Sequence, residues 1–532
     1  MTSTHFLALA VLGSLFAGAS CATQPSDMTT QTRPVSDPAK GSAKNIILMV
    51  SDGIGFNGWL AADYYQGLAG KQSYQTKRPD GTQPVVYGMS HFALNLVDDE
   101  GKPLESKAQL DIVGGAVEQG YDPTTRWKKM ENAFLGDFAT GDDAFRSYTD
   151  SAAAGTALMA GRKTSNGRIN LDWSGEEEFE TIAEIAMKKG RATGAVASVM
   201  VSHATPASVV AHNISRGNYA EIFNEMASSG LDVIMGGGHP LFDVSGRAVD
   251  PVDETSFQFV GGPDTYASLT SDQGLNGYTF IDQKADFEAL ATGGIRPQRL
   301  VGVARTATTL QAARQDLPNA DTLSGVAFNP EVPNLATMSR GALNVLSQDK
   351  DGFFLMIEGG AVDWMGHANN MPRFIEEQVD FNLAIDAVIE WVEANSSWDE
   401  TLLIVTADHE TGGIWGEGTW TNSEGGPVAA TFEENAVEAA RYHPDEDVFN
   451  DFLAVQDKGA GVLPGYQFAS GNHTNELVPL WAIGAGAEHF AEFARTDVKA
   501  AEIWGQPYGW NGNYIDNTSV FFVMERALHA DE

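Results

Sequence analysis

The chain has 532 residues, 43% of them hydrophobic, so it can bury a large core, either as one big α/β domain with insertions or as two domains. Its 71 acidic residues against 33 basic ones give a formal net charge of -38, which argues against a nucleic-acid partner and against anionic membrane surfaces. An acidic surface with few lysines suits a salty environment, so we expect a halophilic or marine protein.

The first 22 residues predict a secretory signal. Residues 6–17 form an apolar run that is too short to cross a bilayer as a helix, and small residues follow it for cleavage. The only cysteine, Cys21, lies in a segment similar to a bacterial lipoprotein box, so plain secretion and a lipid anchor through Cys21 both stay open. Residues 23–44, rich in Pro, Ser, Thr and Gln, predict a disordered tether before a single domain over 45–532.

Residues 45–50 form a continuous apolar run, as expected of a central parallel strand, and Asp52 follows it. Ligands of open α/β sheets gather at the carboxyl ends of strands, so Asp52 is a candidate site residue. The alternative is that Asp52 and Gly53 only form a turn. Residues 57–145 carry no motif, and we interpret them as a large insertion, an arm or a lid over the site.

Residues 152–160 predict a helix of small, strongly helix-forming residues, with Asp150 and Ser151 at its N-terminus. Unpaired backbone N–H groups and the positive end of the helix dipole favour an anion there. A serine at this position can attack phosphorus or a carbonyl while the helix end stabilises the developing charge. The alternative is that Asp150 or Ser151 is simply an N-cap.

Residues 194–201 predict another strand, with His203 and Thr205 just beyond its end. A helix is predicted over 206–212, because proline is favoured in the first helical turn, and the histidine that ends this segment is best explained as structural. Arg216 is either a surface cation or a phosphate clamp, since a guanidinium group makes bidentate bonds to phosphate oxygens.

Residues 231–235 predict a strand that runs into three glycines. These glycines lack the Lys-Ser/Thr of a P-loop, so we interpret them as a tight turn. The following segment, 241–300, predicts mainly loops.

Residues 353–357 predict a strand that ends at Glu358, and Asp363 and His367 follow. The last two are four residues apart, which places both side chains on one face of a helical turn, as a metal pair requires.

A further strand over 401–406 ends in Asp408 and His409, a second carboxylate–imidazole pair. His473 precedes the last predicted apolar strand, 478–483. The chain therefore offers several candidate metal ligands close to strand ends.

Together these motifs resemble those of the alkaline phosphatases. The resemblance covers nearly all of residues 45–486, and the motifs occur in the family's order. It implies an α/β fold, a three-layer sandwich with a mostly parallel central sheet flanked by helices, and hydrolysis of phosphate monoesters through a phosphoserine. The motifs are Asp52-Gly53, Asp150-Ser151, His203 to Thr205, Glu358 to His367, Asp408-His409 and His473-Thr474.

The resemblance also implies the role of each site residue. Ser151 would be the nucleophile and Arg216 the phosphate clamp. Two zinc ions and one magnesium ion are implied as cofactors, an arrangement that suits in-line displacement at phosphorus. The implied ligands are Asp363, His367 and His473 for one zinc; Asp52, Asp408 and His409 for the other; and Asp52, Thr205 and Glu358 for magnesium, with His203 close by.

Trp364 directly follows a predicted zinc ligand. Combined with His203, this tryptophan is similar to marine bacterial members of the family, whereas other branches carry lysine or histidine there. The alternative is that Trp364 only packs the wall of the site. We expect magnesium to be retained, with Trp364 and His203 altering the groups around it.

Two segments depart from a minimal chain of the family, the insertion over 57–145 and a Gly- and acid-rich excursion over 412–465. They could build a crown or arm, cover the site or form a dimer contact. The resemblance implies a homodimer. Together with the signal, it implies a secreted or periplasmic phosphatase that scavenges phosphate.

The nearest alternative is a phosphodiesterase or phosphonate hydrolase of the same superfamily with the same two-zinc core. Arg216 and the magnesium site favour monoesters, because both help to bind an extra anionic oxygen. A sulfatase is disfavoured, since no Cys-x-Pro-x-Arg or Ser-x-Pro-x-Arg motif surrounds Ser151. A non-enzymatic secreted protein that binds metal or phosphate, in which Ser151 would be dispensable, is the alternative from another class.

Overall fold

A computed structural model describes residues 41–94, 121, 123, 148–315, 321–419, 452–469 and 471–529. The predicted signal, Cys21 and almost all of the predicted tether lie outside these residues, as do large parts of the two predicted insertions. Within the described ranges, no helix has the length and apolar character needed to span a membrane.

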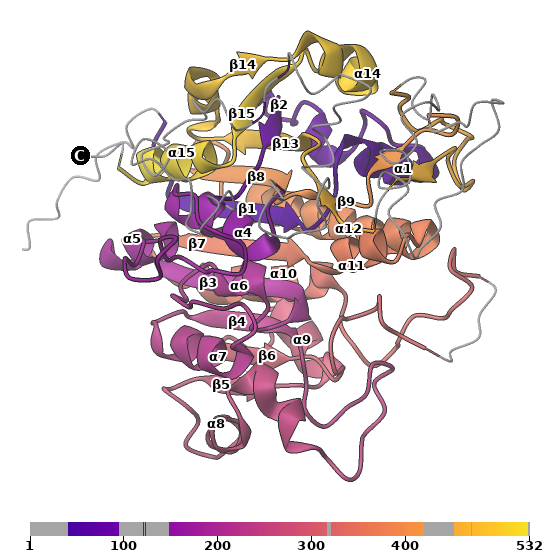
Figure 1. The fold of residues 1–532 in the computed structure, drawn as a ribbon. Coiled ribbons are helices and arrows are strands. Elements are labelled where there is room, and N and C mark those ends of the chain that lie inside the picture. Colours follow the sequence, from indigo (N-terminus) through magenta and orange to yellow (C-terminus); the bar gives the residue numbers. More distant parts are fainter. Residues whose placement is uncertain are drawn as a thin grey trace, which may run out of the picture. The chain divides into compact units, whose positions relative to one another are not determined.

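A central sheet of 11 strands organises the described chain (Figure 1). Its strands, in spatial order, are β14 (Arg495–Thr496), β15 (Asn513–Asp516), β2 (Val85–Ser90), β13 (Val478–Gly484), β8 (Thr401–Ala407), β1 (Asn45–Ser51), β7 (Phe353–Gly359), β3 (Ala192–Met200), β4 (Val233–Gly237), β6 (Leu300–Val303) and β5 (Thr279–Ile281). Two small antiparallel pairs lie outside it, namely β9 (Glu410–Thr411) with β12 (His473–Thr474), and β10 (Ile414–Trp415) with β11 (Gln467–Phe468).

The sheet is parallel from β8 to β5, and β13 and β14 run antiparallel to their neighbours. Every residue of β1, β7 and β8 is buried, as expected of strands covered on both faces. The predicted α/β fold with a mostly parallel sheet is therefore confirmed. β2 lies within the segment 57–145, which is predicted to be an insertion. The first part of this segment therefore contributes a strand to the central sheet.

Helices flank the sheet on both sides (Figure 1). α10 (Leu335–Leu346) packs against both α9 (Lys284–Ala291) and α12 (Met371–Asn395), and α10 and α12 also contact the central strands. Another set of helices packs together around Ser151. It comprises α4 (Ser151–Ala160), α5 (Ile182–Lys188), α6 (Ala204–Ala207), α7 (Tyr219–Ser228) and α15 (Thr518–His529). The remaining helices are α1 (Phe56–Gln66), α8 (Pro263–Leu269), α11 (Ala361–His367) and α14 (Val498–Tyr508), with 3-10 turns at Ser73–Gln75, Glu254–Val260 and Ala487–Phe493.

One prediction of local structure is wrong. The helix predicted over 206–212 is confined to α6, which begins at Ala204, so Pro206 is its third residue. Segment 241–300, predicted as mainly loops, consists mostly of turns and loops, although it also contains α8, α9 and strand β5, and β6 begins at its end. β5 and β6 are only three and four residues long, too short for an alternating pattern to stand out in the sequence.

Four neighbouring parallel strands bring predicted site residues to one edge of the sheet. Asp408 follows β8, Asp52 follows β1, Glu358 is the penultimate residue of β7, and His203 lies just beyond β3. β1 pairs in register with β7 and β8, so the residues at their ends are held at the same level. This edge is where ligands of open α/β sheets bind.

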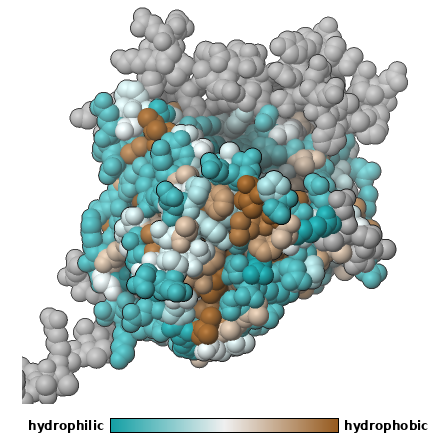
Figure 2. Space-filling view, turned by 90° about the horizontal axis from the view of Figure 1, so that it is seen from below, coloured by the Kyte–Doolittle hydropathy of each residue, from teal (hydrophilic) through white to brown (hydrophobic). Residues whose placement is uncertain are grey.

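The surface seen from below is largely hydrophilic, with hydrophobic residues in a band through its middle and in a smaller patch at the upper left (Figure 2). This face is thus mainly polar, which agrees with the acid-rich composition of the chain.

Candidate active site

Ser151 is the first residue of α4, and Asp150 is its N-cap. Asp150 Oδ1 accepts the backbone N–H of Ala153 at 3.0 Å, and the Asp150 N–H donates to Asn166 Oδ1 at 2.9 Å. The Ser151 side chain is almost completely buried, at 1% exposure. The N-cap interpretation therefore holds for Asp150, and it leaves the Ser151 hydroxyl at the helix N-terminus where an anion is favoured.

Arg216 lies close to Ser151, although it follows Ser151 by 65 positions in the sequence. Its Nη1 donates to Asp150 Oδ2 at 2.9 Å, and its Nη2 lies 3.3 Å from His203 Nε2. Its side chain is only 26% exposed, so the interpretation as a free surface cation is wrong.

Asp363, His367 and His473, which we call the first group, converge on one point. Both histidine Nε2 atoms lie 3.4 Å from Asp363 Oδ1 and 3.1 Å from each other. Each Nδ1 lies 2.7 Å from a backbone carbonyl oxygen, of Gly471 for His367 and of Thr149 for His473. When both Nδ1 atoms donate to these carbonyls, both Nε2 lone pairs face a carboxylate oxygen, an arrangement that a cation satisfies.

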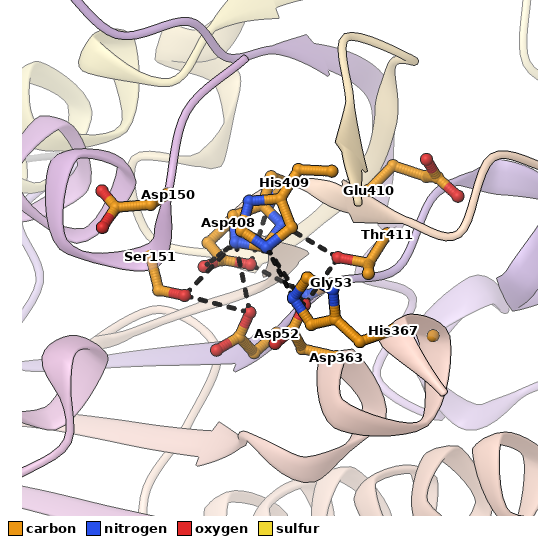
Figure 3. A network of polar contacts seen from close by, with 12 residues as sticks. Asp52, Gly53, Asp150, Ser151, Asp363, His367, Asp408, His409, Glu410 and Thr411 are labelled. Atoms are coloured by element: carbon orange, nitrogen blue, oxygen red, sulfur yellow. Dashed lines mark hydrogen bonds and ion pairs between the residues drawn. The ribbon is translucent and has the colours of Figure 1, made fainter. Parts of the chain in front are cut away.

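Asp52, Asp408 and His409 form the second group, which contacts Ser151 (Figure 3). His409 Nε2 lies 3.4 Å from Asp52 Oδ1 and 3.2 Å from Asp408 Oδ2. The Ser151 hydroxyl lies 3.3 Å from the same nitrogen and 3.5 Å from Asp52 Oδ1. The serine oxygen therefore points into this group.

Asp52 also belongs to a third group with His203 and Glu358, whose ligand atoms all lie within 4.8 Å of one another. Thr205, predicted as a magnesium ligand, is fully buried on α6 and is among the groups that affect the pKa of Glu358. Burial, reinforced by the carboxylate of Asp408, raises the pKa of Glu358 to about 8. Burial and then the charge of Arg216 lower the pKa of His203 to about 3, so this histidine is neutral.

Several buried polar atoms in these groups fit bound cations. In the part of the chain that the structure describes, they have no hydrogen-bond partner. They are Asp52 Oδ2, Asp408 Oδ2, both Glu358 carboxylate oxygens, Thr205 Oγ1 and His203 Nδ1. Because a buried unpaired carboxylate is costly, the donor set of carboxylate, hydroxyl and imidazole fits divalent metal ions.

A cavity of about 530 Å³ reaches the first group and His203 of the third group. Ser151, Arg216, Trp364 and the first group line it, together with Tyr148 and Asn472. Trp364 also packs edge-on against His203, with ring centroids 6.2 Å apart. A serine at a helix N-terminus, an arginine and the first group of metal-type ligands thus surround one open space, together with His203 of the third group.

A model of the alkaline phosphatase family matches residues 122–500. The chain belongs to the alkaline phosphatase family. Alkaline phosphatase 3 of Bacillus subtilis (strain 168) is 30% identical over 447 residues, which cover 74% of this chain and 87% of that protein. The alkaline phosphatase of Escherichia coli (strain K12) is 30% identical over 387 residues, covering 69% and 70%. The chain is accordingly a metal-binding phosphomonoesterase, and the predicted enzyme class is confirmed.

Solved structures show the same fold. The alkaline phosphatase of the Antarctic bacterium TAB5 matches with a TM-score of 0.53 and 23% identity, covering 92% of this chain and 100% of that one. A mutant of that protein with Mg bound in the M3 site matches with a TM-score of 0.53 and 22% identity, covering 92% and 99%.

The prediction from sequence missed three features of the site. Thr411 contacts both the first and the second group, and Tyr148 and Asn472 line the cavity. The adjacency of Thr411 to the pair Asp408-His409 was the available signal. Nothing in the sequence indicates that it touches Asp363, because that contact joins segments 48 positions apart.

Proposed function

We propose that the chain hydrolyses phosphate monoesters by nucleophilic attack of Ser151 on phosphorus, with two zinc ions and one magnesium ion as cofactors. The first and second groups would hold zinc. Asp52, Thr205 and Glu358 would hold magnesium, with His203 beside them. The Mg bound in the M3 site of the TAB5 mutant supports a magnesium position in this fold.

The position of the Ser151 hydroxyl supports this proposal most strongly. It lies within hydrogen-bond distance of two members of the second group and faces the cavity that Arg216 also lines. Zinc ions at the first and second groups would lower the pKa of the hydroxyl and stabilise the charge of the leaving oxygen.

The chain's own residues then perform defined tasks. The planar guanidinium of Arg216 binds two phosphate oxygens and orients the substrate. Ser151 Oγ forms a bond to phosphorus as the ester bond breaks and the alcohol leaves, and the N-terminus of α4 stabilises negative charge at this point. Water then hydrolyses the phosphoserine, which releases phosphate and restores the serine.

Hydrolysis of an aryl phosphate monoester and of its matching diester tests this function. Protein loaded with zinc and magnesium should strongly prefer the monoester, and Ser151→Ala should abolish turnover. Ser339→Ala is a matched control, because this buried hydroxyl on α10 donates only to the carbonyl of Leu335 among the described contacts. Equal turnover of the diester would contradict the preference for monoesters, and an active Ser151→Ala variant would contradict the nucleophile.

The location of the enzyme outside the cytoplasm is proposed from the sequence. The predicted signal over 1–22 favours export to the periplasm or the medium, where the enzyme would release phosphate for uptake, with a lipid anchor through Cys21 as an alternative. Homodimer formation and adaptation to salt are proposed on the same basis. Mass spectrometry of the mature N-terminus distinguishes plain cleavage from lipidation.

A further inference from the structure

The hydroxyl of Thr411 lies between the first and second groups. Its Oγ1 donates to Asp363 Oδ1 at 2.6 Å and lies 3.3 Å from His409 Nδ1. Asp363 is a member of the first group, and His409 is a member of the second. A single, fully buried side chain therefore contacts one candidate ligand of each group (Figure 3).

These two contacts define the direction of each hydrogen bond. A threonine hydroxyl carries one proton, and the short contact with a carboxylate oxygen places that proton on the bond to Asp363. Oγ1 must then accept a proton from His409, so His409 carries its ring hydrogen on Nδ1. Its lone pair lies on Nε2, which is the atom that faces Asp52 and Asp408.

His409 differs in this respect from the histidines of the first group. His367 and His473 are oriented by the backbone carbonyl oxygens of Gly471 and Thr149, respectively. A change of side chain at either of these two positions leaves the carbonyl group in place. The Nδ1 of His409 lies against a side chain instead. Groups of this kind fix the tautomer and the ring orientation of metal-binding histidines.

The backbone around Thr411 holds its side chain in this place. β9 pairs with β12, and Thr411 lies directly opposite His473. Neighbouring residues of a strand point to opposite sides, and Figure 3 shows Thr411 pointing toward the site and Glu410 pointing away from it. Glu410 accepts hydrogen bonds from the Thr474 hydroxyl and from the backbone N–H groups of Gly413 and Ile414, which anchors the strand.

We propose that Thr411 is a positioning residue that orients Asp363 and His409 for metal binding and so couples the two zinc sites. This inference rests on the zinc sites of the proposed function. Without the hydroxyl, a buried carboxylate oxygen and a buried imidazole N–H each lose a partner, which is unfavourable in the protein interior. Both ligands become free to rotate, so both zinc ions are bound more weakly.

Three variants separate the hydroxyl from the shape of the side chain. Thr411→Val keeps the shape and removes the hydroxyl, whereas Thr411→Ser keeps the hydroxyl. Thr406→Val is the matched control, because Thr406 is also fully buried and donates to the carbonyl of Pro479 at 3.0 Å. We expect Thr411→Val to lower the affinity for both zinc ions by about 10- to 100-fold, and the other two variants to remain close to wild type.

Zinc release is the direct measurement. Zinc-loaded wild type and variants are mixed with a chromogenic chelator, and the release of both zinc equivalents is followed in time. Visible spectra of the cobalt-substituted proteins report the ligand geometry, which a purely structural role of Thr411 would leave unchanged. If Thr411→Val does not fold, Thr411→Ala is measured in the same way.

The inference is overturned by wild-type release rates and spectra in the hydroxyl-free variant, by an effect on one zinc only, or by equal effects in Thr411→Ser or Thr406→Val. These results differ from a failure of the proposed function. A wild-type protein that binds no zinc would overturn the two-zinc site itself, whereas a zinc-binding wild type with an unaffected Thr411→Val variant overturns only the role of Thr411.

Discussion

Asp150 connects the proposed nucleophile, Ser151, to the proposed phosphate clamp, Arg216. One of its carboxylate oxygens caps α4 through the N–H of Ala153, and the other accepts from the backbone of Gly167 and from Arg216. The backbone N–H of Arg216 in turn donates to the backbone carbonyl of Gly167 at 2.7 Å. The side chain that caps the start of α4 thus also orients the guanidinium group of Arg216.

Replacing Arg216 by alanine should weaken the binding of inorganic phosphate. Hydrogen bonds to charged groups contribute about 1.5–3 kcal/mol, so we expect the inhibition constant of phosphate to rise about 10- to 100-fold. Arg216→Lys should recover only part of this loss, because lysine keeps the charge without the planar fork.

Competitive inhibition of monoester hydrolysis by phosphate measures this effect. Arg162→Ala is the control, since Arg162 is not among the residues that line the cavity and pairs with Glu177 only at 3.8 Å. Unchanged inhibition in Arg216→Ala would show that Arg216 does not bind phosphate.

Helix α1 is tied to its neighbours by one buried carboxyl group. Asp63 is fully buried on α1 and accepts hydrogen bonds from Gln72 and Gln75 in and beside the 3-10 turn, and from the Tyr508 hydroxyl at the end of α14. Burial raises the pKa of Asp63 from 3.8 to about 7, although these donors oppose the shift. The helix that follows the Asp52 loop is therefore held by a group that titrates near neutral pH.

Asp63 should make the protein less stable as the pH rises from about 4 to about 7. In this window the folded protein retains a proton that the unfolded chain has released, so the free energy of unfolding falls with rising pH. The contribution of the protonated carboxyl is complete below the unfolded pKa and is lost above the folded one. Asp63→Asn, which stays neutral, should show a smaller fall.

Unfolding midpoints of wild type and Asp63→Asn, measured across this pH range, test the prediction. Asp272→Asn serves as the control, because it removes an exposed carboxylate. Parallel pH profiles for wild type and Asp63→Asn would show that Asp63 does not titrate in this window.

The negative net charge of the whole molecule repels anionic phosphate monoesters. The protein carries a formal charge of -38, and phosphate monoesters are anions. With the proposed three divalent ions and Arg216, the site itself would be cationic, because its four carboxylates only partly offset them. A cationic site within a strongly anionic shell should capture its substrate slowly when the field of the shell is not screened.

Catalytic efficiency should therefore rise from low to moderate salt. The Debye length shortens from about 30 Å at 0.01 M to about 10 Å at 0.1 M ionic strength, which screens the surface more than the buried site. Measuring kcat/KM and kcat separately in increasing NaCl tests this, since only substrate capture depends on the long-range field. A steady fall of kcat/KM with added NaCl would contradict the prediction.

The sequence by itself determined the main strands, the helix that begins at Ser151 and the chemical types of the candidate site residues. Continuous apolar runs predict β1, β3, β4, β7, β8 and β13, because parallel central strands are buried on both faces. The helix at Ser151 follows from small helix-forming residues, and the pair Asp363 and His367 follows from helical spacing. All of these signals act within a few residues along the chain.

Only the tertiary structure decided how these pieces meet. The order of the strands brings Asp408, Asp52, Glu358 and His203 to one edge, and no local pattern encodes which strands become neighbours. The ion pair of Asp150 with Arg216 spans 66 positions, and the contact of Thr411 with Asp363 spans 48. Such contacts depend on long-range packing, whereas sequence periodicity reports only the local conformation of the backbone.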